Sequence, residues 1–308
     1  MAALDFRAMM AAERAKRKTD STTTISSRAS ASPIASPPPA SPPPPPPAIH
    51  FSLEERCDRP VLSEAAHGVD GAVSKVYHVP DFLSEREEEA LLCCVDSVPR
   101  EGWTQLRGRK LQQHGGMPGM TSEPLPEWLG SICNALIEAR VFSTAEPPNH
   151  VLVNEYQPGQ GIDAHRDGPL YLPRVAIISL GSHCTFQFLT DDFERRPQTS
   201  LLLPRRGLLV FEADAYKRLL HTVPALHVDE PTASTHRLDL PSSGPTSSFL
   251  AAVAMRAADV AVVAPESGDV VGAPAVVEPD VPARLVQGDA FPRGRRVSLT
   301  VRRVLAST

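Results

Sequence analysis

His150-Val-Leu-Val-Asn-Glu-Tyr156 is followed in this chain by Gln157-Pro-Gly-Gln-Gly161 and then by His165-Arg-Asp167. The first run predicts a β-strand, and the proline and glycines after it mark a turn that delivers the histidine. Because side chains alternate along a strand, Asn154 and Tyr156 share one face. The sequence therefore predicts two neighbouring extended segments that carry polar side chains toward one place.

The triplet that ends this stretch has the pattern of a metal site. Residues i and i+2 of an extended chain point to the same side, so His165 and Asp167 face one metal while Arg166 turns away. His221, more than 50 residues later, is the candidate third ligand. Two histidines and one carboxylate are the ligands of open ferrous sites, which leave positions for a cosubstrate and oxygen. The alternative is a surface loop, where His-x-Asp often arises by chance.

Around this stretch, helices are predicted first and short strands later. A strand is expected at 76–79, and Ser84 with Glu87 forms a capping box for a helix that runs to about Val98. A second helix follows Pro126. We predict an α+β fold, a double-stranded β-helix (jelly roll) with the N-terminal helices packed on it. The later strands are expected at 150–156, 174–181, 184–190, 199–203, 207–212 and 295–305.

The C-terminal stretch Arg296-Val-Ser-Leu-Thr-Val-Arg302 alternates polar and apolar residues. As a strand it would place Arg296 and Arg302 on one polar face and three apolar side chains on the other. Two arginines on one face suit the two carboxylates of a small dicarboxylic acid, and 2-oxoglutarate is the one that ferrous sites of this ligand type use. The alternative is a solvated edge strand that the arginines keep soluble.

Taken in order, Asn-x-Tyr, His-x-Asp, a distal His and Arg-x-Ser-x-x-x-Arg resemble the AlkB family of iron(II)/2-oxoglutarate-dependent dioxygenases. The resemblance covers residues 76–224 and 288–308. Five stretches of closer likeness, in the same order, make coincidence a poor explanation. The stretches most similar to the sixth eukaryotic branch of the family are Trp103–Gln112, Asn149–Asn154, Asp167–Tyr171, Ile178–His183 and Thr199–Leu203.

This resemblance implies that His165, Asp167 and His221 bind iron(II), with 2-oxoglutarate as cosubstrate and molecular oxygen as oxidant. It also implies oxidative demethylation, in which an N-methyl group is hydroxylated and lost as formaldehyde. A zinc hydrolase is a further reading of the ligands. It leaves the two C-terminal arginines with no reason to face the site.

The resemblance also assigns the cosubstrate contacts. Arg296 would pair with the far carboxylate of 2-oxoglutarate, helped by Tyr156, while Asn154 and Arg302 serve the end that chelates the metal. Ser298 stands where the bacterial pattern has asparagine. A contact from this position would therefore be shorter or mediated by water. Serine matches the eukaryotic sixth branch.

The segment Trp103-Thr-Gln-Leu-Arg-Gly-Arg-Lys-Leu-Gln112 is the candidate substrate region. Trp103 could stack on a base, and a dense basic run could hold phosphates. In AlkB relatives this region forms a substrate lid. The alternative is a basic surface hairpin with Trp103 packed into the core. The other candidate substrate contacts are Arg107, Arg109, Lys110 and Gln112.

Composition divides the chain of 308 residues into parts. Residues 1–50 are predicted to be a disordered proline-rich tail, because successive prolines lack amide donors and fix φ. Residues 51–75 are read as a linker, and 76–224 with 288–308 as the dioxygenase domain. The segment 225–287 is rich in Ala, Val, Pro and Ser and poor in aromatics. It is predicted to be a low-complexity insertion.

Further features bear on partners and compartment. Met1–Lys18 is compatible with a short amphipathic helix that binds a protein partner or steers nucleic acid; plain disorder is the alternative. The five cysteines show no Cys-x-x-Cys spacing, which indicates a reducing compartment. No charge-free apolar run is long enough to span a bilayer. We expect a monomer that is located in the nucleus and the cytoplasm.

Three functions fit these observations. The first is a dioxygenase acting on alkylated single-stranded RNA or DNA, with RNA preferred because single strands present a splayed base to a pocket. The second is a dioxygenase of the same mechanism that hydroxylates or demethylates a protein side chain. The third is a nucleic-acid-binding module with little turnover. The net charge of −5 argues against tight nonspecific binding of nucleic acid.

Overall fold

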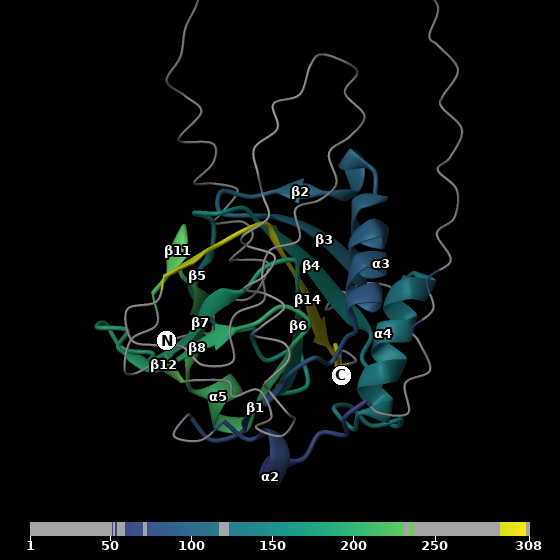
Figure 1. Cartoon of the computed structure of the whole chain (residues 1–308). Helices are drawn as coiled ribbons and strands as arrows, with labels where there is room; N and C mark the ends of the chain where they lie inside the picture. Colours follow the sequence, from purple (N-terminus) through teal and green to yellow (C-terminus); the bar gives the residue numbers. More distant parts are fainter. Residues whose placement is uncertain are drawn as a thin grey trace, which may run out of the picture.

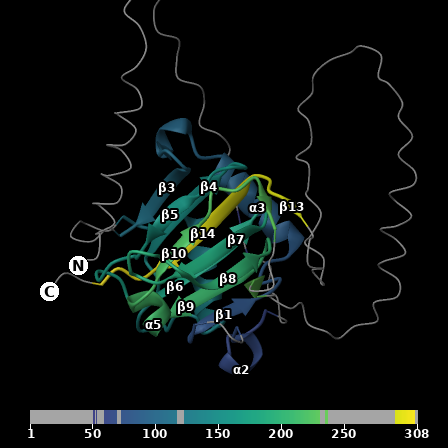
Figure 2. The ribbon, with the colours of Figure 1, turned by 90° about the vertical axis from the view of Figure 1, so that its left-hand side faces the viewer.

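The structure is a computed structural model that describes residues 51, 53, 59–69, 73–116, 123–230, 235–236 and 290–305. Two β-sheets face each other, and two long helices cover the outer face of the larger sheet (Figure 1). The small sheet faces the viewer in Figure 2. The layers therefore run from helices through the large sheet to the small sheet, which is the predicted jelly roll with helices packed on it.

The large sheet has seven strands in the order β1-β9-β6-β14-β4-β3-β2, all antiparallel to their neighbours. The small sheet has the order β12-β8-β7-β10-β5, and only β12 and β8 are parallel. The strands of the large sheet are β1 (Val76–Val79), β2 (Thr104–Gln105), β3 (Lys110–Gly115), β4 (His150–Tyr156), β6 (Arg174–Leu180), β9 (Leu208–Glu212) and β14 (Arg296–Arg302). Those of the small sheet are β5 (Ile162–His165), β7 (Cys184–Leu189), β8 (Pro197–Leu203), β10 (Leu220–Val223) and β12 (Thr235–His236).

Helix α3 begins where the sequence supplies a cap. At the start of α3, the Ser84 hydroxyl accepts a hydrogen bond from the Glu87 amide, and the Glu87 carboxylate accepts one from the Ser84 amide. This is the predicted capping box. No helix in the described part of the chain is long and apolar enough to cross a membrane. The helices are α2 (Glu64–His67), α3 (Glu85–Asp96), α4 (Glu127–Glu138), α5 (Ala213–Lys217) and the 3-10 helix η1 (Arg100–Gly102).

Alternation along β14 separates two cores. Val297, Leu299 and Val301 face the helices and pack with buried residues of α3 and α4. The intervening side chains, beginning with Arg296 and ending with Arg302, point into the space between the sheets. Apolar residues of both sheets form a second core there. The polar face predicted for this strand therefore lies inside the barrel, and the strand is central instead of an edge.

Several predicted elements have the expected bounds. Strands 76–79 and 150–156 are as predicted, and the first long helix ends two residues before Val98. The predicted strand 295–305 is shorter in the structure, as β14. Strands β2, β3, β5 and β10 were not predicted individually, because each is short or carries the polar residues of the site.

The predicted tail, residues 1–50, lies outside the described residues, as do residues 231–234 and 237–287 of the predicted insertion. Part of the predicted linker contacts the domain: Phe51 is buried in the core beneath the helices, and the Leu62 amide donates to the Ala139 carbonyl. The division into tail, linker, domain and insertion stays a prediction.

The two ends of the predicted insertion meet at a buried ion pair. Arg293 donates hydrogen bonds of 2.7 and 2.6 Å to the Asp229 carboxylate and one of 2.7 Å to the Pro224 carbonyl. The Thr185 amide also donates to Asp229. Strands β11 (Val228–Asp229) and β13 (Phe291–Pro292) pair beside these side chains. Val228 and Asp229, which lie within the predicted insertion, therefore contact the sheets through this Asp229–Arg293 junction.

We expect residues 1–50 and 237–288 to be dispensable for binding iron and cosubstrate, because their composition cannot build a packed core. A variant that lacks both segments and joins β12 to β13 by a short linker should be soluble and bind iron with native affinity. Circular dichroism and metal titration measure this. The same deletion combined with Arg293→Ala should lose about 3–5 kcal/mol of stability, because the buried Asp229 carboxylate loses its partner. Failure of the first variant to fold would show that a deleted segment contributes structure.

Candidate metal centre

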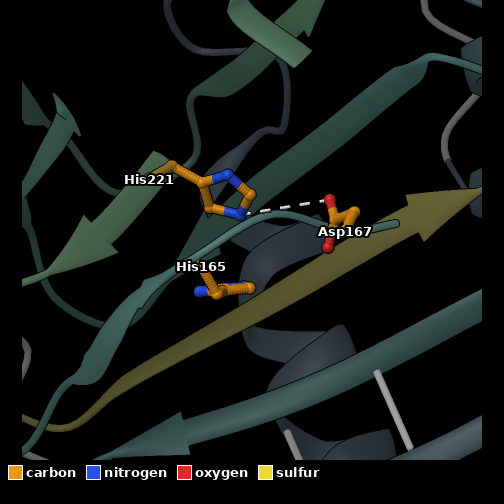
Figure 3. Close-up of side chains that lie close together, drawn as sticks. All are labelled: His165, Asp167 and His221. Atoms are coloured by element: carbon orange, nitrogen blue, oxygen red, sulfur yellow. Dashed lines mark ion pairs between the residues drawn. The ribbon is translucent and has the colours of Figure 1, made fainter. Parts of the chain in front are cut away.

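His165, Asp167 and His221 lie together between the sheets, as Figure 3 shows. His165 is the last residue of β5 and pairs across the ladder with His221 of β10. Asp167 follows His165 by two residues. One side-chain nitrogen or oxygen of each residue lies within 4.8 Å of those of the other two, and all three residues are buried. The three residues that were predicted from their spacing to share a site therefore form a compact cluster.

Local structure orients these side chains. The Nδ1 atom of His165 lies 2.9 Å from the Asp163 carbonyl, which can only accept a hydrogen bond. Nδ1 therefore carries the proton, and Nε2 is left with the lone pair that binds a metal. After Asp167 the chain turns at Gly168, whose φ of 88° favours glycine. The Tyr216 hydroxyl donates a 2.6 Å hydrogen bond to the Gly168 carbonyl and fixes this turn.

Burial sets the charges of the cluster. Burial, and secondarily His165, lowers the pKa of His221 to about 3, and burial also lowers the pKa of His165. Burial acts to raise the pKa of the Asp167 carboxyl, but Arg302 and the histidines outweigh it and hold that pKa below its usual value. At neutral pH the cluster thus offers two neutral imidazoles and one carboxylate. These are the protonation states in which such groups bind metals.

The residues fit a metal ion. The Arg302 guanidinium lies 2.5 Å from one Asp167 oxygen, and His221 Nε2 lies 4.0 Å from the other. Neither carboxylate oxygen has a hydrogen bond of regular geometry, although both are buried. A buried carboxylate without hydrogen bonds is costly unless it pairs with a charge or binds a metal. The donor set and its unsatisfied oxygens therefore suit a ferrous ion.

The predicted cosubstrate residues line the same cavity as the two histidines. Register explains why: Arg296 pairs with Tyr156, and Ser298 pairs with Asn154, on adjacent strands β14 and β4. Directly paired residues point to the same face of a sheet. Arg302, six residues after Arg296, completes this face at the end where Asp167 lies.

The surroundings of the Arg296 guanidinium suit the binding of an anion. Its guanidinium lies over the Tyr156 ring, 5.5 Å from the ring centre, and donates a 2.9 Å hydrogen bond to the Ser179 hydroxyl. Its Nε atom is buried and has no hydrogen-bond partner within the described residues. A buried guanidinium with an unused donor suits a carboxylate, which it can bind through two hydrogen bonds.

Arg109 has a different position from the one predicted. Instead of facing a substrate at the surface, it is only 1% exposed and lines the cosubstrate cavity. Its Nε donates a 3.0 Å hydrogen bond to Asn154 Oδ1. The turn between β2 and β3, closed by a hydrogen bond from the Leu106 amide to the Arg109 carbonyl, directs the side chain inward. Arg109 therefore positions Asn154.

Sequence reasoning missed Ser179, which holds Arg296. Ser179 of β6 pairs with Ser298 of β14, so it lies on the same inner face. A signal was present: Ser179 is a single polar residue within the apolar run Val175–Leu180. A polar residue at a buried strand position needs a partner, and here the partner is Arg296, the predicted cosubstrate arginine.

The other residues of the predicted substrate region do not face one common site. In and before the β2–β3 hairpin, they lie in different surroundings. Trp103 packs against the core beneath the helices, and the Lys110 ammonium lies over its ring while pairing with Glu155. Gln112 donates to the Val95 carbonyl of α3. Strand alternation turns these side chains away from the metal. Arg107 alone of the five is exposed beside the site.

A groove of about 410 Å³ opens between the edge strand β5 and the β2–β3 turn. Its walls contain the exposed Arg107 and the main chain of Gly108 and Gly161. The Gly161 amide donates to the Gly108 carbonyl, and a Cβ atom on Gly108 would lie 2.6 Å from the Gly161 carbonyl oxygen. Glycine is thus required for this close approach. The groove shares Ile162 and Val223 with the cavity that contains the histidines.

Comparison with known proteins shows which family this chain resembles. The family described as the 2OG-Fe(II) oxygenase superfamily matches residues 95–302. Over 189 residues the chain is 41% identical to the probable RNA/DNA demethylase ALKBH6 of Danio rerio, a match that covers 57% of this chain and 80% of that protein. It is 29% identical over 175 residues to the tRNA (carboxymethyluridine(34)-5-O)-methyltransferase ALKBH8 of Macaca fascicularis, covering 51% and 25%. The solved structure of OsALKBH1 aligns with 14% identity and a TM-score of 0.43, covering 74% of this chain and 98% of that one.

Proposed function

The chain belongs to the 2OG-Fe(II) oxygenase superfamily and, within it, to the AlkB family, and from this premise we propose that it removes alkyl groups from nucleic acid, with RNA preferred to DNA. It is an oxidoreductase that uses iron(II), 2-oxoglutarate and molecular oxygen. Bound iron and 2-oxoglutarate let oxygen hydroxylate a substrate C–H bond while the cosubstrate is converted to succinate and carbon dioxide. An N-hydroxymethyl product then releases formaldehyde and leaves the N–H.

In this proposal, the side chains between the sheets have separate roles. His165, Asp167 and His221 hold the iron through two neutral imidazoles and a carboxylate. Arg296 binds the far carboxylate of 2-oxoglutarate with its unused donor. Arg302 keeps the Asp167 carboxylate charged and in place. Fixed charges that are already oriented need no reorganisation during the reaction.

Apolar side chains close the rest of the cavity. Leu152, Ile177 and Phe186 line it beside the histidines, and the Phe186 ring stacks on His221 with ring centres 5.7 Å apart. Excluding water strengthens the electrostatic contacts and protects reactive species from side reactions. The rings also fix the orientation of His221.

The proposal for the substrate rests on the groove that adjoins the cavity containing the two histidines. It adjoins the cavity at Ile162 and Val223, so a group held in it can present one C–H bond to the iron. Arg107 supplies a cation for a phosphate, and Gln160, Asp163 and Thr222 supply hydrogen-bonding groups. An extruded base on a single strand can enter such a groove, whereas a base stacked in a duplex must first be flipped out. The named relative ALKBH6 supports a nucleic-acid substrate.

Substrate-dependent succinate release tests the proposed function. The protein is incubated with iron(II), 2-oxoglutarate and N-methylated single-stranded RNA, DNA of the same sequence or a protein extract. We expect succinate and formaldehyde in equal amounts with methylated RNA, less with DNA, and only background with unmethylated RNA. Stimulation by the protein extract alone would indicate a side-chain hydroxylase. Tight binding of RNA without succinate release would indicate a binding module.

We expect substitutions of Arg107 and Trp103 to have different effects on RNA affinity and on stability. Arg107→Ala should weaken single-stranded RNA binding and reduce the salt dependence by about one counterion, because one phosphate contact is lost. Trp103→Ala should lower the melting temperature and leave RNA affinity unchanged, because the indole packs in the core. Fluorescence anisotropy at several salt concentrations and thermal melting measure both. Arg100→Ala is the control, since Arg100 is exposed on η1. Weaker RNA binding by Trp103→Ala at unchanged stability would contradict this assignment.

The proposal places the protein in the nucleus and the cytoplasm, where RNA and a reducing environment occur together. The four cysteines within the described residues are all free, which fits a reducing compartment. Fluorescence microscopy of the tagged chain tests this placement. Exclusive location in a secretory compartment would contradict it.

A further inference from the structure

We propose that Phe193, at the tip of the hairpin that joins β7 to β8, stacks on a nucleobase next to the one being demethylated. This inference rests on the proposed function and adds a contact outside the metal cavity and the groove. It concerns a side chain that neither the iron site nor the cosubstrate site uses.

Phe193 is unusually exposed. Its exposure is 102%, whereas the other exposed large apolar side chains of the described residues have exposures between 39% and 45%. Burying a phenylalanine is worth about 1.5–3 kcal/mol, and within the described part of this chain Phe193 gains none of it. An aromatic ring left wholly in water beside a site is an available contact surface for a partner.

The hairpin tip contacts the segment that contains His165 and Asp167. Leu189, the last residue of β7, pairs with Leu220, the neighbour of His221. Two residues further on, Asp191 forms an ion pair with Arg166, which lies between His165 and Asp167. Phe193 therefore extends from a segment that is tied to the metal-ligand turn. It lies at the opposite end of β5 from the groove, which begins at Gly161 and Ile162.

The tip is held in one conformation. The Thr190 amide donates to the Arg196 carbonyl, and the Arg196 amide donates to the Thr190 hydroxyl. Asp192 accepts hydrogen bonds from the Thr190 hydroxyl and the Arg195 amide at 2.7 and 2.8 Å. Because the backbone is already ordered, a contact with Phe193 costs little further conformational entropy.

The charges around Phe193 balance, and their pairing leaves one arginine for contact with a nucleic-acid strand. Asp191 is paired with Arg166, while Asp192 and Glu194 are paired with Arg196. The guanidinium of Arg195 has no partner within the described residues. The tip thus presents one aromatic face with one free cation beside it. Proteins that bind single-stranded nucleic acid combine an aromatic for the base with a cation for the backbone.

A strand that enters the groove near Arg107 and crosses the metal opening would reach Phe193 on the far side. The base at the iron must leave the stack of its neighbours, which costs a few kcal/mol. Stacking of a neighbouring base on Phe193 offsets part of this cost. The contact needs no sequence preference, because every base has a flat aromatic face.

The test uses the full chain and a fluorescently labelled single-stranded RNA of about 12 nucleotides, within the range that such proteins bind, with one N-methylated adenine at its centre. Phe193→Ala should weaken binding about five- to 100-fold, and Phe193→Trp should retain or tighten it. The salt dependence of Phe193→Ala should match wild type. That of Arg195→Ala should fall by about one counterion, because only the arginine contacts a phosphate.

Val61→Ala is the matched control, because Val61 is 45% exposed next to Leu62, which is bonded to the end of α4. A series of RNAs with one abasic position each then locates the contact. At the position that stacks on Phe193, removing the base should abolish the difference between wild type and Phe193→Ala. Unchanged affinity of Phe193→Ala, or a loss that is the same at every abasic position, would overturn the proposal.

These outcomes separate the inference from the function on which it rests. A wild-type protein that neither binds nor demethylates RNA or DNA would contradict the proposed function itself. Wild-type binding and turnover with full affinity in Phe193→Ala would overturn only the stacking contact. In that case, loss of capture of a cellular protein by Phe193→Ala would assign the ring to a protein partner instead.

Discussion

Asp167→Asn should abolish iron-dependent decarboxylation of 2-oxoglutarate. The amide keeps the volume of the carboxylate but removes the negative charge that balances a ferrous ion in the buried cluster. Loss of a partner that only orients a metal ligand costs about 10–100-fold in affinity, so loss of a ligand should exceed about 100-fold. Anaerobic iron titration and succinate release measure the two effects.

A structural explanation of such a loss must be excluded. Asp167→Asn leaves the buried Arg302 guanidinium without its ionic partner, which itself reduces stability. The melting temperature without iron therefore serves as a separate measurement. Asp214→Asn is the matched control, because Asp214 is exposed on α5 and belongs neither to the metal cluster nor to the groove. Iron binding and full turnover in Asp167→Asn would refute the assignment of this carboxylate as a ligand.

Arg296→Ala should reduce the affinity for 2-oxoglutarate by about 2–3 kcal/mol, near a hundredfold, while iron affinity stays unchanged. The guanidinium lies between the Tyr156 ring and the Ser179 hydroxyl, and its Nε is unused within the described residues. Arg296→Lys should recover only part of the loss, because an ammonium cannot bind a carboxylate in two parallel hydrogen bonds. Calorimetric titration of the iron-loaded protein gives these affinities.

The neighbouring arginine provides the control for this variant. Arg295 pairs with Asp96 and Glu155 on the helix side of the sheet. Arg295→Ala should therefore leave 2-oxoglutarate affinity unchanged and act on stability alone. An Arg296→Ala titration that matches wild type would place the dicarboxylate elsewhere in the cavity.

Residues with regular alternation were predictable from the sequence. Strand β14 was predicted because polar and apolar residues alternate along it, and strand β4 because a strand-like run precedes a proline-glycine turn. Their pairing brings Asn154 and Tyr156 opposite Ser298 and Arg296. The metal triplet was predictable because two of its members are adjacent in an extended chain. Such features depend on local geometry, which the sequence specifies directly.

Features that depend on distant contacts were not predictable. Arg109 looked like a surface cation, but its burial depends on Asn154, a partner 45 positions later. The contact of Asp229, within the predicted insertion, with Arg293 was not predicted for the same reason, since the two residues lie 64 positions apart. A charged residue is almost never buried without a partner, and the partner is visible only in the fold.

The predicted iron ligand His165 and the predicted cosubstrate residue Arg296 lie on strands that differ in how firmly they are paired. β14 pairs with both β4 and β6, whereas β5 is an edge strand that, among the described residues, pairs only with β10 and does so with an irregular register. Strand ends at a sheet edge open locally at small free-energy cost, while central strands open only in global unfolding. The amides around His165 should therefore exchange with solvent hydrogen far sooner than those around Arg296. Iron should leave this protein by fraying of β5, on a timescale set by that edge, while the receptor for 2-oxoglutarate stays assembled.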